Sequence, residues 1–100
     1  MDKNSLLLDA TIAERGDLRF TPAGLPAIDF LLRHASRQEE AGSERMVECD
    51  LAAVAFGASA RALAATPPGT AIRCKGFLAR RWRTGITVAM HVNEFELIEH

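Results

Sequence analysis

The sequence lacks any long apolar run. No stretch of its 100 residues is hydrophobic for long enough to cross a bilayer as a helix. The opening residues 1–5 lead into a short leucine stretch with no small-residue cleavage site after it, so no signal peptide is predicted. Hydrophobic residues make up 48% of the chain, which is enough for one compact core. We therefore expect a single cytoplasmic domain, residues 1–100, that does not enter a membrane.

Cysteine and metal-ligand patterns are scarce. Cys49 and Cys74 are the two cysteines, and neither has another Cys or a His beside it. Isolated thiols suit a reducing cytoplasm, and we expect both to be small core residues. A disulfide or a zinc site is the second alternative, but C-x-x-C spacing and paired histidines are missing. His34, His91 and His100 also lack metal-ligand spacing, so we predict structural or exposed histidines and no metal.

The motifs of common enzyme classes are absent as well. The sequence has no Walker A motif, no Rossmann glycine fingerprint and no nucleophile elbow. Glu39 and Glu40 are paired in sequence only, and adjacent loop carboxylates do not by themselves converge on a substrate. We find no nucleophile–base pair. The prediction is no catalytic residue, no cofactor and no enzymatic activity.

Acidic residues are missing from the whole segment between Asp50 and Glu94. That segment contains six positive residues: Arg61, Arg73, Lys75, Arg80, Arg81 and Arg83. The net charge of the chain is −1, so the remaining residues carry −7. Such segregation favours a polyanionic partner, because the local field matters more than the total charge. The alternative is that folding returns the acidic residues to the same surface.

Turn signals divide the chain into segments of strand length. Alternating apolar residues predict strands at 6–12, 28–33, 47–56, 72–78 and 86–97, with 18–20 as a short continuation of the first. The alanine-rich segment 59–65, which Pro67 and Pro68 follow, predicts a short helix that plugs a barrel end. Residues 38–43 are expected to be a polar connection between two strands. The predicted inward-facing residues include Val54, Phe56, Leu78 and Ile86.

Irregular points in the alternation predict how the sheet closes. The large apolar residues of 47–56 switch parity, which predicts a bulge near Ala52 and Ala53. Gly76 predicts a kink, and parity switches again between Val92 and Phe95. The pattern favours an all-β fold, a five-stranded OB-fold (oligonucleotide-binding) Greek-key barrel with one short helix between strands 3 and 4. An SH3-like barrel is the main alternative.

The predicted hairpin at 80–85 carries the strongest candidate site, three arginines beside Trp82. Arginines attract phosphates and displace condensed counterions. An indole offers a flat face on which any base stacks, so this pairing is typical of single-stranded nucleic-acid binding. The alternative is that Trp82 folds back onto the barrel, as tryptophans mostly do.

Two further groups extend this candidate site. Arg73, Lys75 and Phe77 alternate on the outward face of their strand and would form a basic stripe leading to the hairpin. Phe77 alternatively packs in a dimer interface. Arg19 and Phe20 repeat the same chemistry more weakly. The complete set of candidate nucleic-acid-binding residues is Arg19, Phe20, Arg33, Lys75, Phe77, Arg80, Arg81, Trp82 and Arg83.

The order of several short motifs resembles the primosomal replication protein N (PriB) family, which is related to bacterial single-stranded DNA-binding proteins. The matching segments are 5–8, 22–26, 30–34, 38–42, 76–77 and 94–98. The resemblance implies an OB-fold homodimer that binds single-stranded DNA without sequence preference, as an accessory protein of the replication-restart primosome. It implies as partners the PriA helicase and, in bacteria that have it, DnaT. The family's basic DNA contacts match Arg19 and the group Arg80, Arg81 and Arg83.

The chain departs from the family pattern at positions where members carry aromatic residues. Ser43 and Glu48 stand there, and a carboxylate repels phosphate and offers no stacking face. The basic residue expected shortly after His34 is shifted to Arg37. We therefore expect DNA binding whose footprint leans toward the hairpin around Trp82. The alternative function is a protein–protein adaptor for a replication helicase, with little DNA binding of its own.

Overall fold

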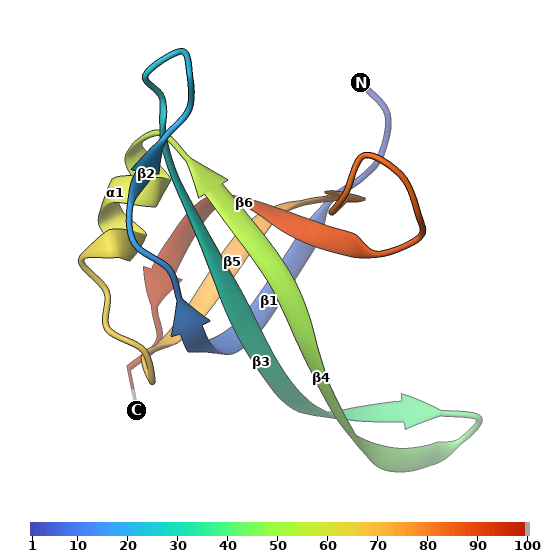
Figure 1. Cartoon of the computed structure of the whole chain (residues 1–100). Coiled ribbons are helices and arrows are strands. Elements are labelled where there is room, and N and C mark those ends of the chain that lie inside the picture. Colours follow the sequence, from blue (N-terminus) through green and yellow to red (C-terminus); the bar gives the residue numbers. More distant parts are fainter. Residues whose placement is uncertain (100) are drawn as a thin grey trace.

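In the computed structural model, which describes residues 1–99, six strands and one short helix form a closed barrel (Figure 1). The elements are β1 (Leu6–Arg15), β2 (Arg19–Phe20), β3 (Pro26–Glu40), β4 (Ser43–Phe56), α1 (Ala58–Ala64), β5 (Ala71–Arg80) and β6 (Val88–Leu97). The strand order is β1-β5-β6-β4-β3-β2, and a β1–β3 pairing closes the sheet. The prediction of a five-stranded OB-type Greek key with one short helix is confirmed. The expected short continuation at 18–20 is the two-residue β2, which pairs with β3.

The barrel interior is filled from every long strand. The side chains of Ile12, Ile28, Leu32, Ile72 and Met90 are fully buried. Their removal from water is the main stabilising contribution to a domain of this size. The predicted alternation of β1, β5 and the middle of β6 is confirmed by this burial.

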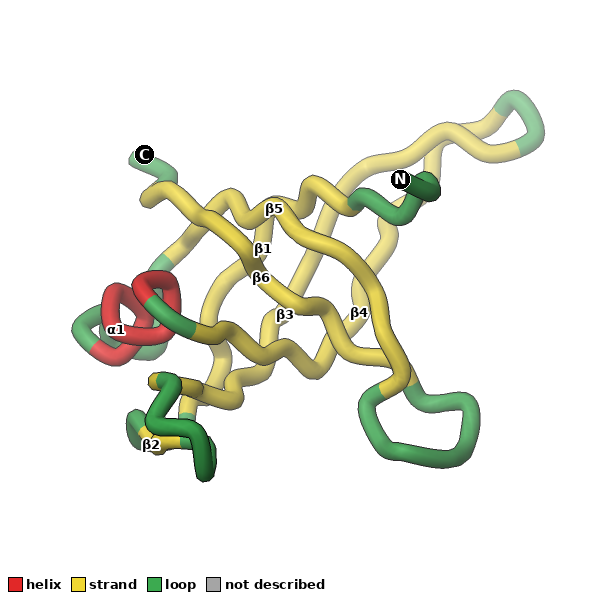
Figure 2. Tube along the Cα trace, turned by 90° about the horizontal axis from the view of Figure 1, so that it is seen from above, coloured by secondary structure: helices red, strands yellow, loops and turns green. Residues whose placement is uncertain are grey.

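Helix α1 lies across one end of the barrel (Figure 2). It begins after Gly57, whose φ of 72° favours glycine, and it buries Ala60 and Leu63 against the core. The predicted helix at 59–65 is therefore confirmed to within one residue at each end. Its position leaves the outer wall of the barrel free for other roles.

A β-bulge interrupts the pairing of β5 and β6 at the predicted kink. Lys75 pairs with Glu94, but the next residue, Gly76, pairs with Val92, so Asn93 is an extra residue in β6. A Cβ atom at position 76 would overlap the carbonyl oxygen of His91. Only glycine fits here, and the skipped residue explains the change of parity between Val92 and Phe95.

The β3–β4 hairpin extends beyond the barrel as an arm of residues 36–47 (Figures 1 and 2). The pairing runs without interruption to Glu40 opposite Ser43, and Ala41 and Gly42 make the turn with φ of 53° and 82°. The expected polar connection at 38–43 is therefore wrong. The two central residues with positive φ form a two-residue hairpin turn, so the strands continue to Glu40 and from Ser43. The polar side chains there belong to exposed strands rather than to a loop.

The predicted bulge at Ala52–Ala53 is also wrong. The β3–β4 register is continuous, and the inner face of β4 is carried by Ala53 and Ala55, which are buried. Val54 and Phe56 point outward. The large side chains suggest a parity change, whereas the buried positions of β4 near α1 are occupied by alanines.

Three smaller expectations need correction. Leu78 is 37% exposed, because β5 by then has passed the end of the core. Ile86 is 96% exposed and lies in the β5–β6 loop, since β6 begins only at Val88. Cys49 is exposed, because β4 there has passed beyond the core, whereas Cys74 is buried as expected, and both thiols are free. His100 lies outside the described residues.

Candidate nucleic-acid interface

A groove of about 530 Å³ runs along the outer wall of the barrel, between β2 and the β5–β6 loop. We call it the arginine groove. It is lined by Arg19, Asp29, Phe30, Ala52, Ala53, Val54, Phe56, Arg80, Arg81, Trp82, Ala89 and His91. Its volume lies within the range of about 300–1,000 Å³ that is usual for ligand sites. Its floor is the outward face of β4 and β6, and its walls carry cationic and aromatic side chains.

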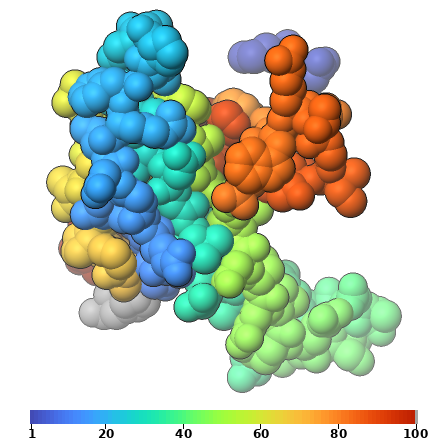
Figure 3. Space-filling model, viewed as in Figure 1, coloured from blue at the N-terminus to red at the C-terminus, as the bar shows by residue number. Residues whose placement is uncertain are grey.

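The cationic wall is the arginine loop, defined as Arg80 together with residues 81–87. In Figure 3 this loop, in orange, stands out from the body of the molecule. The Arg81 backbone N–H donates to the Thr87 carbonyl at 2.8 Å, which closes the loop, and the Arg80 side chain donates to the Arg83 carbonyl at 3.1 Å. Within residues 1–99, the guanidinium groups of Arg80, Arg81 and Arg83 form no ion pair.

Trp82 does not fold back onto the barrel. Its side chain is 59% exposed, and the Arg81 guanidinium lies over the indole ring at 4.6 Å from its centroid. A cation over an aromatic face within about 6 Å is attracted by the ring quadrupole. The contact orders Arg81 and Trp82 together on the groove wall, so that a positive charge and a stacking face stand side by side.

Three rings form a row across neighbouring strands on the outer wall. Phe77 of β5 and His91 of β6 are stacked, with centroids 4.9 Å apart and an interplanar angle of 15°. Phe56 of β4 stacks on the same imidazole at 6.0 Å and 28°. We call these three residues the aromatic row. The predicted site residue Phe77 thus adjoins the groove through His91.

Arg19 occupies the opposite wall, whereas its neighbour in β2, the predicted site residue Phe20, does not line the groove. Arg19 lines the groove, but its guanidinium is bonded to Asp29 at 2.9 Å. This hydrogen bond, with the charge of Asp29, raises the pKa of Arg19 further above its usual value. Phe20 is 57% exposed, and Arg61 lies over its ring at 5.7 Å. Arg19 therefore reaches a ligand only in competition with a carboxylate.

The remaining predicted site residues lie elsewhere. Arg33 is bonded to Asp50 at 3.1 Å beside the base of the arm. Lys75 pairs with Glu94 at 3.8 Å on the β1–β5–β6 wall. The structure brings together Arg19, Arg80, Arg81 and Trp82 in the arginine groove, with Arg83 on its loop and Phe77 next to its floor.

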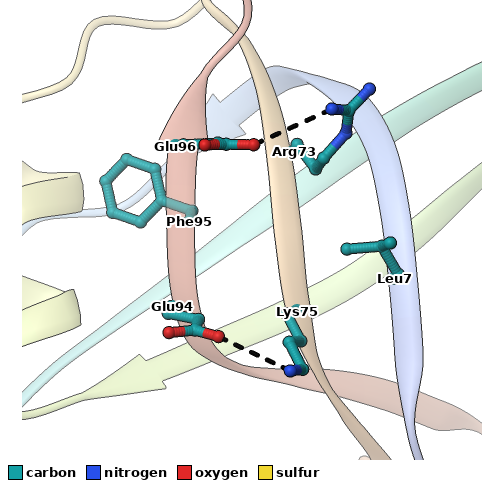
Figure 4. A pocket seen from close by; sticks show the side chains of 6 residues that line it. All are labelled: Leu7, Arg73, Lys75, Glu94, Phe95 and Glu96. Carbon is teal, nitrogen blue, oxygen red and sulfur yellow. Dashed lines mark ion pairs between the residues drawn. The ribbon is translucent and has the colours of Figure 1, made fainter.

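The expected basic stripe on β5 is interrupted by carboxylates (Figure 4). Arg73 is bonded to Asp9 at 2.7 Å and lies 3.8 Å from Glu96. The Arg73 hydrogen bond lowers the pKa of Asp9 below its usual 3.8. Around Arg73 and Lys75, folding therefore brings acidic residues back beside the basic ones, which is the alternative that the sequence left open. The arginine loop is where the segregation of charge persists.

Phe56 and His91 are groove residues that the sequence analysis did not select. The sequence predicts Phe56 as a core residue, because the large side chains of β4 suggest the wrong face, and it predicts a structural or exposed His91, because metal-ligand spacing is missing. The useful signal was the outward position of His91 in β6, opposite Phe77 in the β5–β6 register.

Among residues 1–99, no group of three or more His, Cys, Asp or Glu side chains is placed to hold a metal ion. In the same part of the chain, no helix is long and apolar enough to cross a membrane.

A closed barrel of this strand order, with a cationic and aromatic groove on its wall, has the architecture of the OB-fold class. The family described as "Another single-strand binding protein family" matches residues 4–94. The chain belongs to this family and, within it, to the replication restart protein PriB group.

The relatives cover nearly the whole chain. The replication restart protein PriB of Bordetella pertussis is 45% identical over 91 residues, which are 91% of this chain and 85% of that protein. PriB of Nitrosomonas europaea is 31% identical and covers 98% of this chain and 91% of its own. The crystallised PriB of Ralstonia solanacearum superposes with a TM-score of 0.90 at 36% identity, covering 98% of this chain and 100% of that one. The single-stranded DNA-binding protein of Thermus aquaticus superposes with a TM-score of 0.76 at 26% identity, covering 97% of this chain and 50% of that one.

Proposed function

We propose that this protein binds single-stranded DNA without reading its sequence and acts as an accessory protein in replication restart. The observation that carries the proposal is the arginine groove. Arg80 and Arg81 line it and Arg83 follows on the same loop, with exposed guanidiniums that no carboxylate of residues 1–99 neutralises. Trp82 adds an exposed stacking face beside them. The names of the PriB relatives supply the cellular process.

The binding mode follows from these side chains. Arginines neutralise phosphates and release counterions, so affinity falls steeply with salt. Stacking on an indole is open to every base, so affinity depends little on sequence. The arm contributes little in this proposal, because Glu48 faces the hollow at its base and each arm arginine is paired, Arg37 with Glu44 and Arg45 with Glu40. The footprint therefore centres on the arginine loop.

The proposal extends to assembly and partners. We infer a homodimer, in which Leu7, 65% exposed between Arg73 and Lys75, lies at the contact. The protein partners are the PriA helicase and, where the bacterium has it, DnaT, and the protein acts in the cytoplasm. Binding and not catalysis is the activity, in line with the family's description.

The test is binding to a labelled oligonucleotide over a range of salt concentrations. The double variant Arg81→Ala/Arg83→Ala should weaken binding at low salt. It should also reduce the slope of log K against log salt by about 1.4, because each phosphate contact on a single strand contributes about 0.7. Arg45→Ala on the arm is the matched control and should leave the slope unchanged. Trp82, the single tryptophan, reports the same event by its fluorescence.

Three results would overturn the proposal. The first is unfolding of the double variant, which would make the arginines structural. The second is a slope that Arg45→Ala and the double variant change equally. The third is the absence of any low-salt binding and of any Trp82 response, which would favour the helicase adaptor instead.

A further inference from the structure

His91 is held in an unusual setting on the floor of the arginine groove. Phe77 stacks on one side of its ring at 4.9 Å, and Phe56 lies at 6.0 Å on the same imidazole. Nevertheless, no hydrogen bond to either ring nitrogen is formed by any of residues 1–99. In His34, by contrast, Nδ1 is 2.6 Å from the Asp9 carbonyl and Nε2 is 2.8 Å from the Ser36 hydroxyl.

The two histidines therefore differ in what they have to offer a ligand. The nitrogens of His34 are occupied by the fold. Those of His91 are available, while stacking fixes the plane of the ring and removes most of the orientational entropy that a free side chain would lose on binding. The side chain is half-buried, so its polar edge is presented to the groove rather than to bulk water alone.

The groups around His91 couple its charge to an anionic ligand. The residues of β4 and β5 that neighbour His91 are Phe56, Val54 and Phe77, and none of them has a titratable side chain. The charged groups lining the same groove are Arg80 and Arg81, and Arg19 with its partner Asp29. The Lys75–Glu94 pair follows beyond Phe77. A phosphate bound in the groove brings a negative charge that favours the charged form of a neighbouring imidazole.

We propose that His91 is a DNA-contacting residue that takes up a proton as a strand enters the groove and then donates a charge-assisted hydrogen bond to a phosphate. This inference rests on the proposed binding of single-stranded DNA. Histidine is the side chain that ordinarily changes charge between pH 5 and 8. A group that gains a proton on binding strengthens the complex as pH falls, because protons are then more available. Affinity should accordingly rise as pH decreases from 8 to 5.5.

The test is the dissociation constant for a labelled oligothymidine, measured from pH 8 to pH 5.5 at fixed ionic strength. For the natural chain we expect affinity to increase about tenfold, the size of one charge-assisted hydrogen bond of about 1.5 kcal/mol. His91→Phe keeps a ring in the row and removes the nitrogens. It should lose most of this increase, judged against its own affinity at pH 8. His34→Gln, which alters a histidine away from the groove, should retain it.

Calorimetric titration in two buffers of different ionisation enthalpy measures the proton directly, and binding should take up protons in the natural chain and in His34→Gln but not in His91→Phe. An equal pH response in His91→Phe would overturn the inference, and so would a flat response in the natural chain. Should His91→Phe fail to fold, His91→Gln takes its place. Salt-dependent binding at pH 8 tests the proposed function separately, so the two failures are distinguishable.

Discussion

At the scale of single residues, the pairing of charges decides which arginines are available. Asp9, Asp29 and Asp50 each accept two hydrogen bonds from one guanidinium, which they share with Arg73, Arg19 and Arg33 respectively. These fork-like pairs hold their arginines more firmly than a single contact would. The sequence could not reveal them, since the partners lie 10 to 64 residues apart. It did reveal the arginine loop, because no acidic residue is near it in the chain.

The two thiols allow a prediction about pH. Burial, with the charge of Asp9 in second place, raises the pKa of Cys74 from 9.0 to about 11. The folded thiol thus stays protonated between pH 9 and pH 11, where an unfolded thiol ionises. The contribution of Cys74 to stability is complete below pH 9 and is lost as pH rises toward 11. Urea unfolding over this range should show stability falling with pH, more steeply than in Cys74→Ala.

Thiol modification gives a second test of the burial of Cys74. At pH 8 a thiol reagent should modify one equivalent in the folded protein, at the exposed Cys49, and two in urea. The chain has no tyrosine that would titrate in this alkaline range. Rapid modification of both thiols without unfolding, or identical pH slopes in the two proteins, would contradict the prediction.

At the scale of elements, the β5–β6 bulge depends on one glycine. Gly76→Ala would place a Cβ against the backbone of His91, which cannot move aside as a flexible side chain could. Separating the two strands there should lower the free energy of unfolding by about 3 kcal/mol. Gly16→Ala is the matched control. Its Cβ would lie 3.6 Å from the Asp29 carbonyl oxygen, an ordinary contact, so its effect should stay within about 0.5 kcal/mol.

Equilibrium unfolding in urea measures both changes, with circular dichroism as the probe. A loss of similar size in both variants would mean that backbone freedom, rather than the close approach of His91, limits position 76. A neutral Gly76→Ala would show that the bulge relaxes without cost.

The strands and the helix also differ in how well the sequence alone predicts them. The number and type of the main elements followed from alternation and from the alanine-rich segment before Pro67. The arm did not, because its strands are exposed on nearly all sides and no apolar period marks them. In β4 the buried side chains are the small Ala53 and Ala55, so the larger outward residues gave the wrong face. Neighbouring strands, not local sequence, set these two features.

At the scale of the whole molecule, different walls of one barrel carry different charge. The arginine groove is cationic, whereas the β1–β5–β6 wall alternates Arg73 and Lys75 with Glu94 and Glu96 (Figure 4). A net charge of −1 is therefore compatible with a polyanionic ligand on the first wall. The mixed wall suits a different partner, since a surface bearing both signs can complement a second copy of itself.

The last prediction concerns that second copy. Leu7 projects between Arg73 and Lys75 beside a hollow of about 280 Å³. A two-fold contact places the same patch on both subunits, so the positive residues of one copy face the negative residues of the other around two leucines. Leu7→Glu adds a carboxylate to each side, and it should raise the dissociation constant of the dimer at least about tenfold, which is about 1.4 kcal/mol. Because Leu7 is 65% exposed, the melting temperature of the protomer should change little.

Sedimentation velocity over a range of concentrations measures this change. Leu25→Glu, at an exposed leucine between β2 and β3, is the control and should leave the dimer intact. A natural chain that sediments as a monomer would remove the homodimer from the proposal, and an intact Leu7→Glu dimer would move the contact to another wall. If the dimer forms through the β1–β5–β6 wall around Leu7, each arginine groove stays open. Most of its lining comes from β2, β3, β4 and the arginine loop, and its two β6 residues, Ala89 and His91, are not among those that line the hollow beside Leu7. Two grooves on one dimer then allow a single strand to be held at two points, which strengthens binding through effective concentration without any new contact.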